Sequence, residues 1–228
     1  RQIDVMDAGT TMRFLTAYYA ISGSSRIMTG TDRMKERPIK PLVDALRTIG
    51  ADIRYLGREG YPPLEIQGFS GQKSREVTVP GNLSSQFISA LMMIGPALPQ
   101  GLVIRLDGHV GSRPYITMTE AMMRMFGASV RFDGNTVEIE PGGLKPVTYA
   151  VEPDWSAASY WFSFCALSEN GRFSLPGNFS VSFQGDQVMG EIGTMLGVKS
   201  LRSATSLELE KGDHLQHIEW DFSDCPDL

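Results

Sequence analysis

A repeat of about 70 residues constrains the fold of this 228-residue chain more than any other feature. Three segments share one order of patterns: a helical stretch that ends in glycine, a short strand, a turn and a second short strand. The glycines are Gly50, Gly127 and Gly197, which lie 77 and 70 residues apart. Each stands where a helix C-terminus needs a positive φ, so the repeat has a steric cause.

A second helix start precedes each of these segments. The pairs Arg13-Phe14, Gln86-Phe87 and Ser159-Tyr160 recur at a spacing of 73 residues. A short strand is predicted between the two helices of each unit, so a unit reads β-α-β-α-β-β. This pattern favours an α/β fold of repeated units over a solenoid, whose repeats run about 20 to 47 residues.

The first helix of each unit carries little charge after its first turn. The stretches are Phe14–Ile21, Phe87–Ile94 and Tyr160–Leu167. We therefore expect the units to pack around a shared axis, with these helices buried. After the third unit, the residues His217–Asp221 look like the opening strand of a fourth.

The bulk composition is typical of a soluble globular protein, with 42% hydrophobic and 21% charged residues. A net charge of −5 argues against a nucleic-acid or anionic-membrane partner held by bulk electrostatics. No apolar run approaches membrane-spanning length, and no secretion signal is apparent. Cys165 and Cys225 fit no metal or redox spacing, so reduced thiols and a cytoplasmic location are expected.

Unusual polarity marks the joint between a predicted strand, Glu76–Val79, and the helix that follows it. Phe87, Leu91, Ile94 and Leu98 would form one buried stripe of this helix. Three small polar residues, Ser84, Ser85 and Gln86, stand at its start. A helix N-terminus offers free N–H groups and a positive dipole, so these residues could hold an anion or a polyol. The simpler alternative is that one serine only caps the helix.

Cationic residues recur at other predicted helix starts. Gly9 and Arg13 lie at one predicted helix start, where backbone N–H groups and a guanidinium could bind an anion. Arg37 and Arg113 each precede a proline, and Pro38 is predicted to be the first helical residue, with Ser112 as a cap before Arg113. A solvated surface arginine remains the alternative at each position.

The candidates for acid–base chemistry are three aspartates and three histidines. They are Asp154, Asp186, Asp227, His109, His214 and His217. No metal-ligand spacing, P-loop, dinucleotide glycine pattern or G-x-S-x-G motif is present. The residues alone thus predict an α/β repeat protein that binds a phosphorylated or carboxylated small molecule.

Taken together, these motifs resemble the 5-enolpyruvylshikimate-3-phosphate (EPSP) synthase family, enolpyruvyl transferases of the shikimate pathway. The matching stretches run nearly end to end and include residues 8–13, 33–39, 84–87, 112–115, 184–186 and 226–227. The resemblance implies two domains, each an inside-out α/β barrel of three such units. Residues 1–151 would be most of the first domain, and residues 152–228 the first unit of the second.

The resemblance also implies roles for individual residues. Shikimate 3-phosphate would be held by Ser84, Ser85, Gln86, Ser112 and Tyr115, with Asp154 at the same site. Phosphoenolpyruvate would be bordered by Gly9, Arg37 and Gln86, with Arg13 and Arg33 nearby. Asp227 would accept the proton of the attacking hydroxyl as general base, and Arg37 would stabilise charge. Neither a metal nor an organic cofactor is implied, and a monomer is expected at full length.

The sequence departs from the family pattern at two residues and in two motifs. Asp7 stands where the family usually has asparagine, and Phe14 where it often has proline or leucine. The N-terminal Lys-Ser and Arg motif and the C-terminal arginines and lysine of the family are not found in these residues. We therefore expect a central fragment that is inactive by itself.

Two other functions compete with this interpretation. UDP-N-acetylglucosamine enolpyruvyl transferase shares the fold, but Ser84-Ser-Gln-Phe87 favours the shikimate enzyme, and no cysteine-bearing loop occurs between Ser22 and Glu36. A non-catalytic anion-binding module built from the same repeat is the second alternative.

Overall fold

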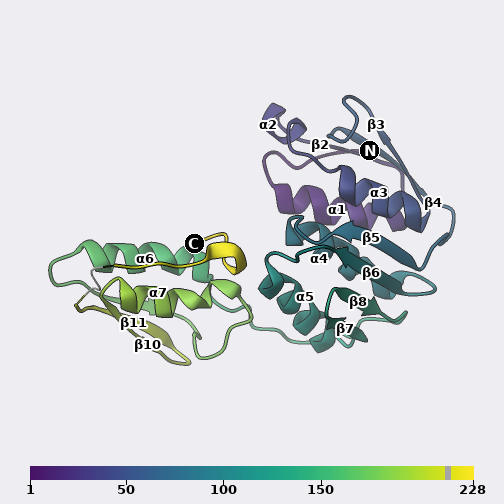
Figure 1. Cartoon of the computed structure of the whole chain (residues 1–228). Coiled ribbons are helices and arrows are strands. Elements are labelled where there is room, and N and C mark those ends of the chain that lie inside the picture. The colour runs from purple at the N-terminus through teal and green to yellow at the C-terminus, as the bar shows by residue number, and fades with distance from the viewer. Residues whose placement is uncertain (214–216) are drawn as a thin grey trace. The chain divides into compact units, whose positions relative to one another are not determined.

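The computed structural model describes residues 1–213 and 217–228, which form two units (Figure 1). Unit 1 comprises residues 1–111 and 119–147, and unit 2 comprises residues 112–118 and 148–228. His214, one of the acid–base candidates, lies outside the described residues. In the part of the chain that is described, no helix has the length and apolar character needed to cross a membrane.

The three predicted repeats are visible in the order of the elements. The first contains β1 (Gln2–Asp4), α1 (Gly9–Ile21), β2 (Arg26–Thr29), α2 (Asp32–Lys35), α3 (Lys40–Ile49), β3 (Ala51–Tyr55) and β4 (Leu64–Phe69). The second contains β5 (Glu76–Pro80), α4 (Ser85–Ile94), the 3-10 helix η1 (Gly95–Ala97), β6 (Leu102–Asp107), α5 (Arg113–Met125), β7 (Val130–Asp133) and β8 (Thr136–Ile139). The third contains α6 (Trp155–Leu167), β9 (Arg172–Pro176), the 3-10 helix η2 (Gly185–Val188), α7 (Met189–Met195), β10 (Val198–Arg202) and β11 (Ser206–Lys211), and a last 3-10 helix, η3 (Phe222–Asp224), follows.

Each repeat builds its own sheet, and the sheets of the first two repeats share one topology. The strand order is β1-β2-β4-β3 in the first and β5-β6-β8-β7 in the second. The first two strands of each sheet run parallel, with Ile3 opposite Met28 and Val77 opposite Ile104, and the others pair antiparallel. The α/β repeat fold predicted from the sequence is therefore confirmed for unit 1.

The third sheet has three strands in the order β10-β11-β9, and the described residues contribute no counterpart of β1 or β5 to it. The strand expected just before Asp154 is not formed, and the opening strand predicted at His217–Asp221 is not formed either. A short strand is stable only when its backbone groups pair with a neighbour, and neither segment has a ladder partner among the described residues. Both predictions were wrong.

Glycines end the second helix of each repeat, as predicted. Gly50, Gly127 and Gly197 have φ values of 126°, 87° and 78°. Residues with a Cβ rarely adopt this conformation, which lets the chain turn directly from helix to strand. The glycine spacing is thus a direct sign of the three helix–strand turns.

The core of unit 1 lies between helices α1 and α4, which pack against each other (Figure 1). Eight of the ten residues of α4 are buried, including the predicted stripe members Phe87, Leu91 and Ile94. Leu98 is buried as well, but α4 ends at Ile94 and a 3-10 turn containing Pro96 carries the chain onward. Proline cannot donate to the helix ladder, which explains the early end.

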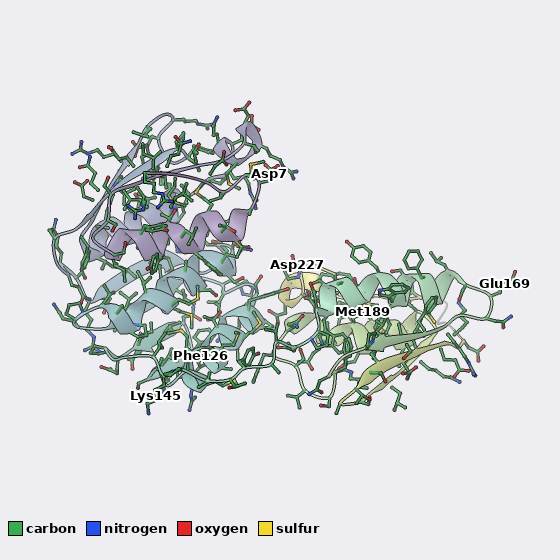
Figure 2. The ribbon with its side chains drawn as sticks, turned by 180° about the vertical axis from the view of Figure 1, so that it is seen from behind. Asp7, Phe126, Lys145, Glu169, Met189 and Asp227 are labelled. Carbon is green, nitrogen blue, oxygen red and sulfur yellow. The ribbon has the colours of Figure 1, made fainter. Side chains whose placement is uncertain are left out.

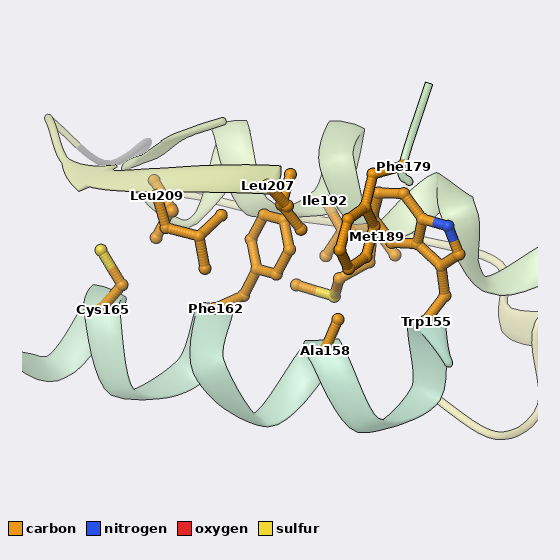
Figure 3. Close-up of a cluster of buried hydrophobic side chains, with 10 residues drawn as sticks. Trp155, Ala158, Phe162, Cys165, Phe179, Met189, Ile192, Leu207 and Leu209 are labelled. Atoms are coloured by element: carbon orange, nitrogen blue, oxygen red, sulfur yellow. The ribbon is translucent and has the colours of Figure 1, made fainter. Parts of the chain in front are cut away.

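The core of unit 2 lies on one face of α6 (Figure 3). Trp155, Ala158, Phe162 and Cys165 point from this face toward α7 and the sheet. They pack against Phe179, Met189, Ile192, Leu207 and Leu209, and Cys165 is a free, buried thiol.

The opposite face of α6 corrects the prediction that Tyr160–Leu167 is interior. Tyr160, Phe164 and Leu167 are 70%, 59% and 86% exposed. A helix that is apolar all round needs partners on every side, whereas the described elements that pack closely on α6, namely α7, η2 and its own sheet, leave this face open.

Candidate functional site

In unit 1, polar side chains join the starts of α1 and α4. The Arg13 guanidinium donates to Gln86 Oε1, and Gln86 Nε2 donates to Thr10 Oγ1 at 3.0 Å. The guanidinium also lies 4.8 Å from the centroid of the Phe87 ring. These contacts span 73 and 76 residues of sequence, so packing of the two repeats brings the two predicted helix entrances together.

Arg37 reaches the same entrance from the turn between α2 and α3. Its Nη1 donates to the Asp7 carbonyl oxygen at 3.4 Å. A Cβ at Gly9 would lie 2.5 to 2.7 Å from the Arg37 guanidinium, so only glycine allows this approach. Gly9, Met12, Arg13, Met34 and Arg37 line a small pocket at this point.

The electrostatics of this pocket favour an anion. Burial, followed by the positive charge of Arg37, lowers the pKa of Arg13. Both effects disfavour the charged form, and a bound carboxylate or phosphate would relieve the repulsion between the guanidinium groups. The free N–H groups at the start of α1 add to this preference.

The sequence argument for Arg37 needs a correction. Pro38 is not the first helical residue, because α3 begins at Lys40 and carries Pro41 in its first turn. Arg37 therefore lies ahead of the helix rather than at its N-terminus. A proline does mark the helix start as the rule predicts, but it is Pro41.

Ser84 and Ser85 occupy the start of α4. Ser84 is the N-cap residue, but its side chain makes no capping hydrogen bond. Ser84 is exposed, whereas Ser85, the first helical residue, is buried. The simple capping alternative is thus not supported for Ser84, whose hydroxyl is available at the helix N-terminus.

Three other residues singled out from the sequence, Asp7, Arg33 and His109, also lie in unit 1. Asp7, the departure from the family pattern, accepts a hydrogen bond from Thr31 Oγ1 in the loop before α2. Arg33 is exposed on α2. His109 belongs to the loop behind Gly81, where its carbonyl oxygen would lie 2.8 Å from a Cβ at position 81.

Unit 2 holds the remaining predicted site residues. Ser112 precedes the first residue of α5, Arg113, and has a φ of 52°. Tyr115 Oη lies 2.9 Å from Asp186 Oδ1 and 3.2 Å from Asp227 Oδ2. Figure 2 shows Asp227 at the end of unit 2 opposite Glu169.

Asp154 is the N-cap of α6, and its Oδ1 accepts from the Ala157 N–H at 3.0 Å. A cap alone accounts for this contact. The carboxylate is nevertheless exposed, which leaves its second oxygen open to solvent.

One residue of these networks was missed as a site residue from the sequence: Ser156, which binds Asp186. It lies two 73-residue spacings after Thr10, which binds Gln86. The same spacing, applied to every residue of the helix starts, could have found it.

Comparison with known proteins gives one consistent result. The sequence model of the family described as EPSP synthase (3-phosphoshikimate 1-carboxyvinyltransferase) matches residues 1–228. A relative from Bacteroides fragilis named 3-phosphoshikimate 1-carboxyvinyltransferase is 46% identical over 228 residues, which are 99% of this chain and 55% of the relative. One of the same name from Actinobacillus pleuropneumoniae is 39% identical over 227 residues, which are 97% of this chain and 52% of the relative.

The solved structures agree at the level of the fold. An EPSP synthase from Acinetobacter baumannii is similar with a TM-score of 0.75 at 22% identity, and the match covers 99% of this chain and 52% of that one. The chain thus spans about half the length of the relatives and the structure that it matches.

Proposed function

The chain belongs to the EPSP synthase family, and from this premise we propose that it supplies the central part of an enzyme that transfers the enolpyruvyl group of phosphoenolpyruvate to shikimate 3-phosphate. In this proposal residues 1–151 are most of the first domain, and residues 152–228 are the first repeat of the second. The two four-stranded sheets before residue 140 and the three-stranded sheet after residue 171 support this division.

The observation that carries the proposal is the close approach of Arg37 to Gly9 in a small pocket that Arg13 also lines. Two guanidinium groups at one helix N-terminus, with a glycine that admits a ligand to the backbone, suit an anion such as phosphoenolpyruvate. Gln86, bonded to Arg13 and Thr10, borders the same pocket. Ser84 and Ser85, at the neighbouring start of α4, would bind shikimate 3-phosphate, with Arg33 as a further nearby cation.

In the proposed reaction Asp227 is the general base, which accepts the proton of the attacking hydroxyl group. The attacking hydroxyl oxygen of shikimate 3-phosphate forms a bond to the enol carbon of phosphoenolpyruvate, while Asp227 accepts the hydroxyl proton and a proton from solvent adds to the methylene carbon. The C–O bond to phosphate then breaks in the tetrahedral intermediate, inorganic phosphate leaves, and the methyl carbon returns a proton to solvent, which restores the double bond. Arg37 would stabilise the developing charge, and Ser112, Tyr115 and Asp154 would orient shikimate 3-phosphate.

A chimera provides a complete protein for testing this proposal. Residues 1–228 would replace the matching segment of the Bacteroides fragilis relative, whose remaining length the chain does not cover. Residues 1–228 by themselves are expected to release no phosphate.

Calorimetric binding to the chimera tests the anion pocket. We expect Arg37→Gln to weaken phosphoenolpyruvate binding roughly ten- to hundredfold, because a charge-assisted hydrogen bond contributes about 1.5–3 kcal/mol. The matched control is Arg54→Gln on β3, whose side chain is 63% exposed and 3.9 Å from Asp52. Equal affinities for the chimera and its Arg37→Gln variant would favour a non-catalytic module.

The choice of acceptor separates the two enolpyruvyl transferases. Shikimate 3-phosphate should protect the chimera against thermal unfolding, whereas UDP-N-acetylglucosamine should not. Protection by the nucleotide sugar alone would instead assign the chain to the second enzyme.

A further inference from the structure

A buried carboxylate in unit 2 has no role in the proposed reaction so far. Asp186, in η2, is only 1% exposed. One of its oxygens accepts a hydrogen bond from Ser156 Oγ, and the other accepts from Tyr115 Oη at 2.9 Å. Burying a carboxylate is costly unless donors compensate it, so both hydroxyl groups are needed here.

The backbone around Asp186 is closely packed. A Cβ on the preceding residue, Gly185, would lie 2.8 Å from the Pro114 side chain and 2.9 Å from the Asp224 carbonyl oxygen. Only glycine therefore lets η2 approach the start of α5 and the segment that carries Asp227. All of these residues belong to unit 2.

The Tyr115 hydroxyl has one proton but two carboxylate neighbours. Asp186 Oδ1 lies 2.9 Å away and Asp227 Oδ2 lies 3.2 Å away. The shorter contact is to the buried carboxylate, which bulk solvent does not reach, whereas Asp227 is exposed. The Tyr115 hydroxyl accordingly donates mainly to Asp186, and Asp227 receives the weaker share of this hydrogen bond.

We propose that Asp186 is a positioning residue that acts through Tyr115: by accepting the main hydrogen bond of the Tyr115 hydroxyl, it weakens the donation from Tyr115 to Asp227 and leaves Asp227 better able to accept the proton of a substrate hydroxyl. Asp186 itself is too buried to touch a substrate. Burial, followed by the hydrogen bond to Asp186, raises the pKa of Tyr115, so the phenol stays a donor at neutral pH. This inference rests on the proposed function, since it concerns the base of that reaction.

The first test is a double-mutant cycle on phosphate release by the chimera. We expect Asp186→Asn to lower kcat at least tenfold, because the Tyr115 hydroxyl turns to Asp227 and makes it a poorer acceptor. The KM for shikimate 3-phosphate should change less than twofold. The double variant Asp186→Asn/Tyr115→Phe should be no slower than Tyr115→Phe alone, because Asp186 has nothing to position once the hydroxyl is gone.

The matched control is Asp224→Asn, which changes an exposed carboxylate on η3 and should leave kcat unchanged. A merely structural role for Asp186 would give losses that multiply in the double variant. That result, or an Asp186→Asn variant with kcat within twofold of the parent, would overturn the inference. A parent chimera without turnover would instead count against the proposed function.

A second measurement does not depend on turnover. Alkaline titration of the Tyr115 ¹³Cζ signal in residues 1–228 reports the groups that face its hydroxyl, Asp186 and Asp227. Asp186→Asn should let Tyr115 ionise at lower pH than in the parent chain, since its strongest acceptor is lost. If Tyr115 ionised at the same pH in the variant and the parent chain, Asp186 would not be the main acceptor of the Tyr115 hydroxyl, and the inference would be overturned.

Discussion

Helix α4 of unit 1 and helix α6 of unit 2 open equivalent repeats, but they are buried to different extents. Among the residues of α4, only Gln86 and Met93 are not fully buried, and α1, α3 and β6 pack against this helix. α6 is as apolar, yet Tyr160, Phe164 and Leu167 face solvent, and α1 likewise exposes Tyr18 at 57%. The prediction that Phe14–Ile21 and Tyr160–Leu167 are interior is therefore wrong, and the sequence pattern alone cannot establish burial.

The largest loss of stability is expected from truncating a side chain on the buried face of α6. Phe162 is fully buried, and its ring would lie 2.3 Å from a Cβ on Gly193 of α7. Phe162→Ala should destabilise unit 2 by about 3–5 kcal/mol through lost burial and a cavity. Hydrogen exchange followed by mass spectrometry should show lost protection in unit 2 but not in residues 1–111.

The matched control for that variant is Phe164→Ala, two residues along the same helix. Phe164 is 59% exposed, so its loss should change stability by less than about 0.5 kcal/mol. Equal losses of protection in the two variants would contradict the assignment of a buried and an exposed face.

A smaller loss of stability is expected from removing a buried hydrogen bond of α4. Ser89 is buried, and its hydroxyl lies 2.7 Å from Thr119 Oγ1. Ser89→Ala should cost about 0.5–1.5 kcal/mol, the net contribution of one hydrogen bond. In α6, Ser163→Ala removes an exposed hydroxyl bonded to the Ser159 carbonyl oxygen and should be neutral within about 0.5 kcal/mol. Urea unfolding of both variants measures the difference between their free energies of unfolding. Similar losses of stability in the two variants would contradict the different burial of Ser89 and Ser163.

Part of this arrangement could be predicted from the sequence, and part could not. The glycines at helix ends and the alternation in β3, β4, β7 and β8 are local signals, and they gave the correct strands and turns. The 73-residue spacing placed Arg13 and Gln86 at equivalent positions, although only the packing of α1 on α4 shows that they touch. The missing strand before α6 and the exposed face of α6 depend on partners far away in sequence, so no local pattern could reveal them.

Tyr55 should make the stability of unit 1 depend on pH in the alkaline range. Burial raises its pKa to about 12, with Arg47 acting in the opposite direction. The unfolded chain, with a tyrosine pKa of about 10, loses its proton first. The contribution of Tyr55 to stability is therefore complete below pH 10 and is lost as the pH rises toward 12.

Tyr55→Phe should remove that alkaline dependence. The buried hydroxyl has no hydrogen-bond partner among the described residues, so its removal should cost less than about 0.5 kcal/mol at neutral pH. Thermal unfolding from pH 7 to 11 measures both effects. A variant with the same alkaline loss as the parent would refute the assignment to Tyr55.

The smallest effect on stability is expected from polar substitutions on the exposed face of α6. Replacing Tyr160, Phe164 and Leu167 by serine should leave the unfolding midpoint nearly unchanged, because these side chains are already in water. Fluorescence of a hydrophobic dye such as ANS should fall clearly in this variant. Unchanged dye fluorescence would mean that the apolar surface lies elsewhere.

The rate of phosphate release by the chimera is the most direct test of the account, because only a working enolpyruvyl transferase releases phosphate from this pair of substrates. We predict release with phosphoenolpyruvate and shikimate 3-phosphate together, and none when UDP-N-acetylglucosamine replaces shikimate 3-phosphate. A folded chimera that released no phosphate with the first pair of substrates would contradict the assignment.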